Sequence, residues 1–581
     1  MANTHRLWKS SAWRMCLLSI AVGNSILVEA DAADPVKFEN TRPEVKYVGD
    51  EACKGCHSAE YDGFKQTGMG NSMTIPSPGD PLGDVRKSKE ITGPEAGRVY
   101  RSYVRDGKLF HEMEQKGERA FLQTYEVLYS VGSGRTGRSY LIGRDGFLFM
   151  SPLSYYAAVG DWDRSPGQAL YRGFERPAPL QCVACHSGIP RPLGGDTNRY
   201  EQPAFEHLAI GCERCHGPGE AHVNVRLAGK EVAREADLTI VNPARLPAGL
   251  RDDVCNQCHL IGDIRVMQPG KTDLDFRPGT PLDNTASAFN LPAGMKPPGS
   301  QAVDQVNQMK MSRCWQQSNG KLGCISCHDA HQSMHGPEAV SGYRSRCLSC
   351  HDASACVAPV SSRQNTSPPD NCLKCHMPQS EVSDVAHAPR TNHGIPRDDA
   401  QALERMLADD FGGRVDLTWE TPVEGQPDPG LRSLALAYSK AAEKLQFFLG
   451  RATGLMERAV KTFPNDAEVQ AEFGLLLSRV GPTRSTDAVS ALERALALGS
   501  PSLAAKAALA QIYREQGDTN QAIKLYREAI ASDPYDSSIS LSLARIYLSV
   551  DRPEEAGELI DKVRSFDPAN PALEEFSSNR P

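Results

Sequence analysis

Three patterns of apolar and polar residues follow one another along the chain. Near the N-terminus an apolar run extends from Met15 to Val28. Apolar residues then alternate with polar ones within 99–104 and 139–142, which is the period of a β-strand with one face on a core. From about 430 to 575 alanine, leucine and glutamate dominate, and a period of 34 residues appears. The patterns predict strands early in the chain and helical repeats at its end.

Two β-hairpins are predicted between residues 57 and 182. The apolar runs at 99–104 and 109–110 flank Asp106-Gly107, and those at 139–142 and 147–150 flank Asp145-Gly146. Asp-Gly is typical of the tight turn of a hairpin. We therefore expect a small β-hairpin insert in this interval.

The 34-residue period fits the tetratricopeptide repeat. One copy contains Leu509, Ala510, Tyr513, Ala522, Tyr526, Ala529 and Pro534, and the next contains Leu543, Ala544, Tyr547, Ala556 and Pro568. An earlier copy fits if two residues are inserted near 481–486, and a fourth, ending at Pro464, fits only in its second half. Stacked helix pairs of this kind form an α-helical solenoid with a concave face. We expect a surface that docks a protein partner; the alternative is a structural cap or a dimerisation module.

The motif Cys-x-x-Cys-His occurs seven times, whereas a random chain of this composition would contain on the order of 0.01 copies. Two thiols at this spacing add to the two vinyl groups of one haem, and the following His ligates the iron. We therefore predict seven covalently attached haem c groups. The predicted attachment cysteines and proximal histidines are Cys53, Cys56 and His57; Cys182, Cys185 and His186; Cys212, Cys215 and His216; Cys255, Cys258 and His259; Cys324, Cys327 and His328; Cys347, Cys350 and His351; and Cys372, Cys375 and His376.

A single such motif could equally be half of a zinc site or a thiol redox pair, so the first 33 residues matter. Basic residues precede the apolar run, and small residues at Ala30, Ala32 and Ala33 follow it, which is typical of a cleaved secretory signal peptide. Haem c is attached outside the cytoplasm, and zinc ribbons are mostly cytosolic. The sequence thus predicts a periplasmic or otherwise exported protein.

Charge and hydropathy limit the kinds of partner that we expect this protein to bind. Removing residues 1–33 takes away three basic and two acidic residues, so 61 basic and 70 acidic residues remain, a formal charge of −9. Seven haems would add up to about fourteen propionate charges, which makes nucleic acid an unsuitable partner. A second apolar run of the length that a membrane helix needs does not occur. We expect redox partner proteins and no transmembrane segment in the mature protein.

These observations predict a mainly α fold in five parts. They are a signal peptide (1–33), the first haem motif with a β-rich insert (45–178), a six-haem cytochrome c domain (179–395), a linker (396–430) and the tetratricopeptide repeats (431–575). In the second and third parts loops and short helices would wrap the haems, because porphyrin faces would supply much of the core. We expect little regular secondary structure there.

The second axial ligand of each iron is the open question. Outside the motifs and the signal peptide there are seven histidines: His111, His207, His222, His331, His335, His387 and His393. His331 follows His328 too closely to reach the other side of the same iron, so it would have to ligate a neighbouring haem. Two further cysteines, Cys314 and Cys356, form a disulfide, remain as thiols, or react at an open haem.

The segments around 212–223, 324–331 and 372–396 resemble the cytochrome c-552/4-like family of multihaem cytochromes, and the whole chain resembles exported members with C-terminal tetratricopeptide repeats. The resemblance implies that His222, His331, His387 and His393 are distal ligands. It does not place His111, His207 and His335, which stay possible ligands. Related chains have Ser-x-His after the first motif, whereas this chain has Thr67-Gly68-Met69, so Met69 is an alternative ligand of the first haem, which would raise its potential.

Two functions from different classes remain. With two axial ligands on every iron the protein would be an electron-transfer conduit, which we favour. With one iron open it would be a multihaem oxidoreductase acting on a small nitrogen or sulfur species. Every motif ends in His, so the sequence marks no catalytic haem and leaves the question of enzymatic activity undecided. A third hypothesis makes the haem region a redox sensor or tether.

Overall fold

A computed structural model of the chain describes residues 37–80, 87–117, 120–194, 197–230, 232–233, 237–292, 295, 305–334, 336–380, 390–396, 415–423 and 425–576. Residues from Phe38 to Pro581 form one compact unit, and everything below concerns this unit. The predicted signal peptide lies outside the described residues.

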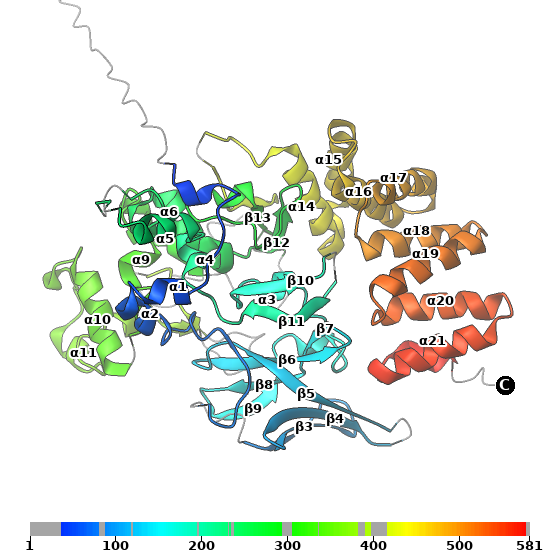
Figure 1. Ribbon diagram of the computed structural model, residues 1–581, viewed down its shortest axis with the longest axis horizontal. Coiled ribbons are helices and arrows are strands. Elements are labelled where there is room, and N and C mark those ends of the chain that lie inside the picture. The colour runs from blue at the N-terminus through cyan, green and yellow to red at the C-terminus, as the bar shows by residue number, and fades with distance from the viewer. Residues whose placement is uncertain are drawn as a thin grey trace, which may run out of the picture. The chain divides into compact units, whose positions relative to one another are not determined.

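The first half of the unit contains a nine-stranded antiparallel sheet (Figure 1). Both predicted hairpins are confirmed, with Arg105 paired to Lys108 and Arg144 paired to Phe147. Each turn has two residues with positive φ: 52° and 76° at Asp106 and Gly107, and 48° and 84° at Asp145 and Gly146. Asp and Gly tolerate this conformation, which matches the twist of the flanking strands. The strands are β1 (Met73–Thr74), β2 (Lys89–Thr92), β3 (Arg98–Arg105), β4 (Lys108–Gln115), β5 (Phe121–Val131), β6 (Gly137–Arg144), β7 (Phe147–Met150), β8 (Leu153–Tyr156) and β9 (Asp161–Arg164).

The prediction of a small hairpin insert in a mainly α chain is wrong, because this sheet is far larger. Two of the strands show no clear alternation of apolar and polar residues, each for a physical reason. β5 carries a register shift between Val127 and Tyr129, which breaks its alternation. β8 is buried at all of its positions, so no polar face marks it. Between the strands lies an aromatic core that includes Tyr140, Phe149 and Trp162.

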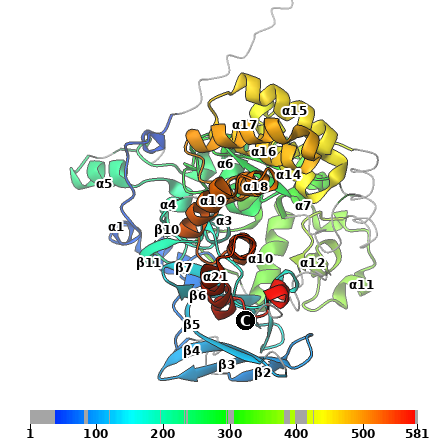
Figure 2. The same cartoon turned by 90° about the vertical axis from the view of Figure 1, so that its right-hand side faces the viewer.

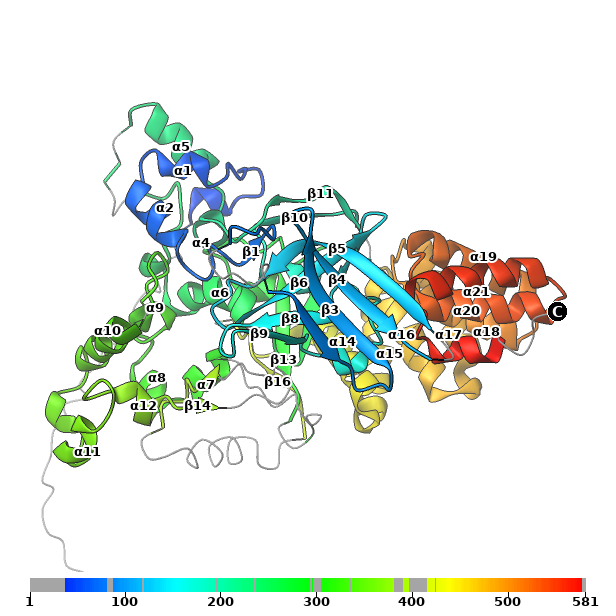
Figure 3. The same cartoon turned by 90° about the horizontal axis from the view of Figure 1, so that it is seen from below.

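The middle of the chain is also more regular than expected, so the prediction of little secondary structure there is wrong. Helices carry all or part of each Cys-x-x-Cys-His motif, and three small sheets lie in the same part of the chain (Figure 3). The strands are β10 (Ile189–Pro192), β11 (Tyr200–His207), β12 (Ile264–Met267), β13 (Ala286–Asn290), β14 (Gln379–Ser380), β15 (Arg390–Thr391) and β16 (Thr418–Trp419). The helices are α1 (Glu51–Lys54), α2 (Ser58–Phe64), α3 (Leu180–Val183), α4 (Glu213–His216), α5 (Glu220–Leu227), α6 (Ala248–His259), α7 (Gln305–Met311), α8 (Arg313–Gln317), α9 (Cys324–Cys327), α10 (Gly336–Leu348), α11 (Val360–Gln364) and α12 (Cys372–His376).

The apolar core is unevenly distributed in this middle part. Among the described residues, no buried hydrophobic side chain lies between Met311 and Ala435. Helices α9 to α12, which carry the last three motifs, therefore fold without an apolar side-chain core of their own.

Four helix pairs end the chain, and their stacking is visible in Figure 2. At Gly474 an added Cβ would lie 2.5 Å from Leu492, so only glycine allows these two helices to approach so closely. None of the described helices is long and apolar enough to cross a membrane. The helices are α14 (Gly430–Lys444), α15 (Leu449–Thr462), α16 (Ala467–Val480), α17 (Ser485–Ala497), α18 (Leu503–Glu515), α19 (Thr519–Ser532), α20 (Ser537–Ser549) and α21 (Pro553–Phe566).

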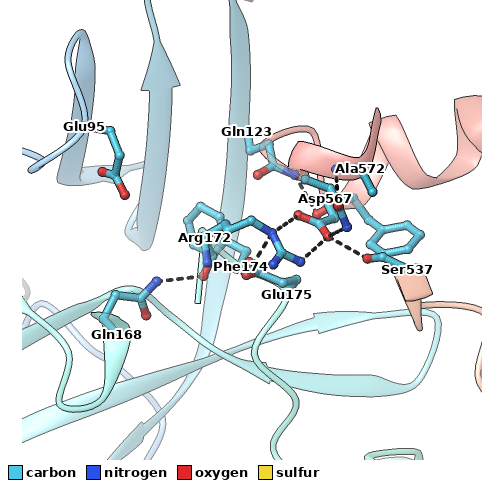
Figure 4. A network of polar contacts seen from close by, with 12 residues as sticks. Glu95, Gln123, Gln168, Arg172, Phe174, Glu175, Ser537, Asp567 and Ala572 are labelled. Atoms are coloured by element: carbon cyan, nitrogen blue, oxygen red, sulfur yellow. Dashed lines mark hydrogen bonds and ion pairs between the residues drawn. The ribbon is translucent and has the colours of Figure 1, made fainter. Parts of the chain in front are cut away.

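The helix pairs are attached to the rest of the chain at two places. At the first, the apolar core of the repeats continues into β12 and β13 through Val266 and Phe289. At the second, Asp567 at the end of α21 forms a two-point ion pair with Arg172, which follows the sheet (Figure 4). The repeats are thus held at their beginning and at their end.

Candidate functional site

The backbone of the motifs places both thiols and the imidazole on one side of a single helical turn. In motifs 1, 3, 5 and 6 the N–H of the His donates to the carbonyl of the first Cys at 3.0–3.1 Å. Motifs 4 and 7 lie within α6 and α12 and have the same helical form. Residues i, i+3 and i+4 of a helix share one face, so these six motifs present Cys, Cys and His together. In motif 2 the N–H of His186 donates instead to the Val183 carbonyl at 3.0 Å.

Three pairs of imidazole rings from distant parts of the chain face one another. The ring centres of His57 and His222 lie 6.4 Å apart with an angle of 32° between the planes. Those of His216 and His331 lie 5.9 Å apart at 12°, and those of His328 and His393 lie 6.3 Å apart at 28°. In each pair one ring belongs to a motif. The other ring belongs to a histidine that the resemblance assigned as distal.

This spacing fits two ligands on opposite sides of one metal ion. An imidazole nitrogen lies about 2 Å from its metal and the ring centre roughly 1 Å further, so opposed rings have centres about 6 Å apart. Two histidines on a tetrahedral zinc would bring the centres to about 5 Å. Among the residues that the structure describes, no three His, Cys, Asp or Glu side chains converge as a ready-made metal cluster. The spacing of the pairs therefore fits a metal ion bound between two rings.

The second nitrogen of most of these rings has a fixed partner. The Nδ1 atoms of His216, His376 and His393 each lie 2.9 Å from a backbone carbonyl, those of Val241, Pro396 and Thr391. His222 differs, because its Nδ1 lies 3.1 Å from both the Asp237 carboxylate and the Thr239 hydroxyl. A fixed Nδ1–H leaves Nε2 free to ligate a metal, so these contacts set the tautomer that ligation requires.

Thiols of different motifs are close neighbours. A hydrogen bond with Cys212 lowers the pKa of Cys53 and raises that of Cys212. The same relation joins Cys258, whose pKa is lowered, to Cys185, and it joins Cys324, whose pKa is lowered, to Cys255. Weaker electrostatic interactions join Cys215 to Cys258, Cys327 to Cys350 and Cys347 to Cys372. The motifs therefore form the continuous series 1, 3, 4, 5, 6, 7, with motif 2 beside motif 4.

The histidines of motifs 2 and 4 are exposed, as are His57 and His328 of motifs 1 and 5. Desolvation by neighbouring groups lowers the pKa of His186 and of His259. Within the described part of the chain, neither ring forms a facing pair of the kind seen at motifs 1, 3 and 5. His351 of motif 6 is exposed, and the ring of His376 in motif 7 is partly buried.

The other predicted ligands are not brought together in this way. His111 is fully buried in the sheet, where its ring meets Tyr140 and Trp162 edge-on and its Nδ1 lies 2.7 Å from the Ser151 hydroxyl. His207 is exposed at the end of β11, with its ring against Gly49. Met69 was the alternative second ligand at the first motif, where the His222 ring faces His57. The Met69 side chain is half-buried.

The remaining expectations concern two possible histidine ligands and the two cysteines outside the motifs. His335 and His387 lie outside the described residues. Cys314 and Cys356 are both free thiols in the structure, the first half-buried and the second exposed. Asp237 and Thr239 were missed from the sequence, because no motif marks a carboxylate that contacts a histidine only after folding.

The environment of His111 predicts a pH-dependent contribution to stability. Burial lowers its pKa from 6.5 to about 3, so the folded protein holds it neutral while the unfolded chain protonates it. Below pH 6.5 the unfolded state binds the extra proton, so stability falls as pH falls towards 3 and is flat above about 7.5. From pH 7.5 to 4.5 this residue should remove roughly 2–3 kcal/mol from the free energy of unfolding. Denaturant titrations at both pH values should show a smaller loss in His111→Gln, and an equal loss would contradict this.

Comparisons with known proteins identify the end of the chain. The tetratricopeptide repeat family matches at residues 477–537 and 513–576. No curated protein sequence matches the chain. Solved structures with similarity include MamA (21% identity, 22% of this chain and 74% of that chain, TM-score 0.21) and YrrB, described as a TPR protein with an unusual peptide-binding site (16%, 26% and 84%, 0.22). A tetratricopeptide repeat protein from Parabacteroides merdae is similar at 15% identity over 24% of this chain and 54% of that chain, with a TM-score of 0.22.

The C-terminal region is therefore a tetratricopeptide repeat array, a class of domain that mediates protein–protein interaction. The matches cover only this part of the chain and do not include the motif-bearing part.

Proposed function

We propose that this protein is an exported heptahaem c-type cytochrome that transfers electrons and docks a redox partner through its tetratricopeptide repeats. The three facing imidazole pairs carry the proposal, because a pair at this spacing suits the two axial positions of one haem iron. In motifs 1, 3 and 5 two thiols precede the paired histidine, which is the arrangement that covalent attachment needs. A bound haem c supplies a one-electron carrier whose potential depends on its ligands and its burial.

The chain's own residues hold each site and bring the sites close together. His57 and His222, His216 and His331, and His328 and His393 would each hold one iron between them. Neighbouring thiols of motifs 1 and 3, of motifs 2 and 4, and of motifs 4 and 5 would bring these attachment points close together. Within the described residues, the lack of buried apolar side chains around α9 to α12 also suits a region that large planar groups would complete.

Mass spectrometry of the denatured, purified holoprotein tests this proposal, since covalent haem survives unfolding. We expect the mass of the chain without residues 1–33 plus seven haems, together with the absorption of c-type haem. A mass without haem, or zinc released on denaturation, would refute the proposal. Replacing both cysteines of motif 6, Cys347 and Cys350, should remove one haem mass; replacing Cys314 and Cys356 instead should remove none.

A second function concerns motifs 2, 4, 6 and 7, whose histidines have no facing ring within the described residues. An iron held there by one imidazole would have an open position, as in an oxidoreductase acting on a small nitrogen or sulfur species. Carbon monoxide binding to the reduced holoprotein distinguishes the two functions. A purely electron-transferring protein gives no adduct, whereas an open site gives one for each such haem.

A further inference from the structure

The hydrogen bonds around His222 set its ring apart from the other paired histidines. Asp237 Oδ2 lies 3.1 Å from His222 Nδ1, and the Thr239 hydroxyl oxygen lies 3.1 Å from the same nitrogen. The Thr239 hydroxyl in turn donates to Asp237 Oδ1, and the Thr239 backbone N–H donates to that oxygen at 2.9 Å. The His222 Nδ1 is therefore linked to the Asp237 carboxylate both directly and through the Thr239 hydroxyl.

This carboxylate is shielded from water. The side chain of Asp237 is 7% exposed and that of His222 is 18% exposed. Arg226 also contacts Asp237 Oδ2, but the arginine side chain is 32% exposed, so water screens its charge more than that of the aspartate. The arginine thus also holds the carboxylate in position.

The other rings receive no such charge. His216 and His393 donate to neutral backbone carbonyls, and His328 meets the hydroxyl of Tyr343 at 3.3 Å. The Nδ1 atom of His331 lies 3.9 Å from Asp329 Oδ1, which is too long for a hydrogen bond, and both side chains are about 40% exposed. Asp329 accepts instead from the backbone N–H of His331 at 2.9 Å. Among the three facing pairs, only His57–His222 therefore has a buried carboxylate on a ring nitrogen.

From this geometry we infer that Asp237 is a positioning residue that lowers the reduction potential of the haem at the first motif. The inference rests on the proposed function. A carboxylate on Nδ1 makes the imidazole a stronger donor to iron and so stabilises the ferric state. The first haem then lies at the low-potential end of the series, which is opposite to the effect that Met69 would have as a ligand.

The test is a spectroelectrochemical titration of the haem-loaded protein and its Asp237→Asn variant, which keeps the shape of the side chain and removes the charge. We expect one of the lowest-potential components to move to higher potential and one low-spin EPR signal to shift, with the other components unchanged. Thr239→Val, which removes only the hydroxyl route, should cause a smaller shift in the same direction.

The matched control is Asp329→Asn, which removes an exposed aspartate beside His331 and should leave the titration unchanged. A wild-type chain without haem would overturn the proposed function. Fully loaded Asp237→Asn and Thr239→Val proteins whose titrations and EPR signals superpose on the wild type would overturn this inference alone. Equal shifts in the Asp237 and Asp329 variants would also overturn it, because general charge and not the hydrogen bond would then be the cause.

Discussion

His331→Ala is expected to convert one haem of the loaded protein from low-spin to high-spin. The His331 ring faces His216 of motif 3 with 5.9 Å between ring centres, and no other imidazole is paired with His216 in the described part of the chain. Without it, the iron that we propose at motif 3 keeps one strong axial ligand, as at an open site. Magnetic circular dichroism or EPR should show one additional high-spin haem, and the reduced variant should bind one additional carbon monoxide.

The control for this experiment is His207→Ala. His207 is exposed and lies against Gly49, so the variant should contain the same number of low-spin haems as the wild-type protein. A His331→Ala protein with the spin state and carbon monoxide binding of the wild type would show that the facing pair does not ligate an iron.

Asp567→Ala is expected to lower the free energy of unfolding by about 3 kcal/mol and to loosen the last repeat from the sheet. The Asp567 side chain is only 1% exposed and accepts hydrogen bonds from Arg172 at 2.6 and 3.1 Å. It also accepts from Ser537 at 2.6 Å and from Asn570 at 2.7 Å, so the variant leaves three donors without their partner (Figure 4). Losing one partner of a buried ion pair typically costs 3–5 kcal/mol, and the half-exposed Arg172 places this case at the lower end.

Hydrogen exchange measured by mass spectrometry localises this effect. Peptides from α20, α21 and β5 should exchange faster in Asp567→Ala, because Gln123 of β5 also donates to the Phe566 carbonyl at 3.1 Å. Glu575→Ala is the matched control: it breaks the exposed pair with Arg545 and should cost less than about 1 kcal/mol. Unchanged exchange in α20 and α21 of the Asp567 variant would show that this contact does not hold the repeats.

The sequence predicted those features whose cause is local. The hairpins at Asp106-Gly107 and Asp145-Gly146 follow from the positive φ that these residues tolerate. The repeats follow from small residues at fixed positions, of which Gly474 against Leu492 is an example.

Features that depend on contacts between distant segments were not predictable. His111 looked like any other free histidine, and only the packing of Tyr140 and Trp162 around it shows a core residue. Which ring faces which motif depends on how α5 and the segment after α9 fold back. Asp237 acquires its importance only from its distance to His222. The sheet was underestimated because a bulge in β5 and full burial of β8 hide the period-2 pattern.

Anomalous X-ray scattering at the iron edge from crystals of the holoprotein shows whether the facing histidine pairs hold iron. We expect an iron peak between the rings of His57 and His222, another between His216 and His331, and a third between His328 and His393. Iron peaks away from these ring pairs, or peaks that appear only at the zinc edge, would contradict this expectation.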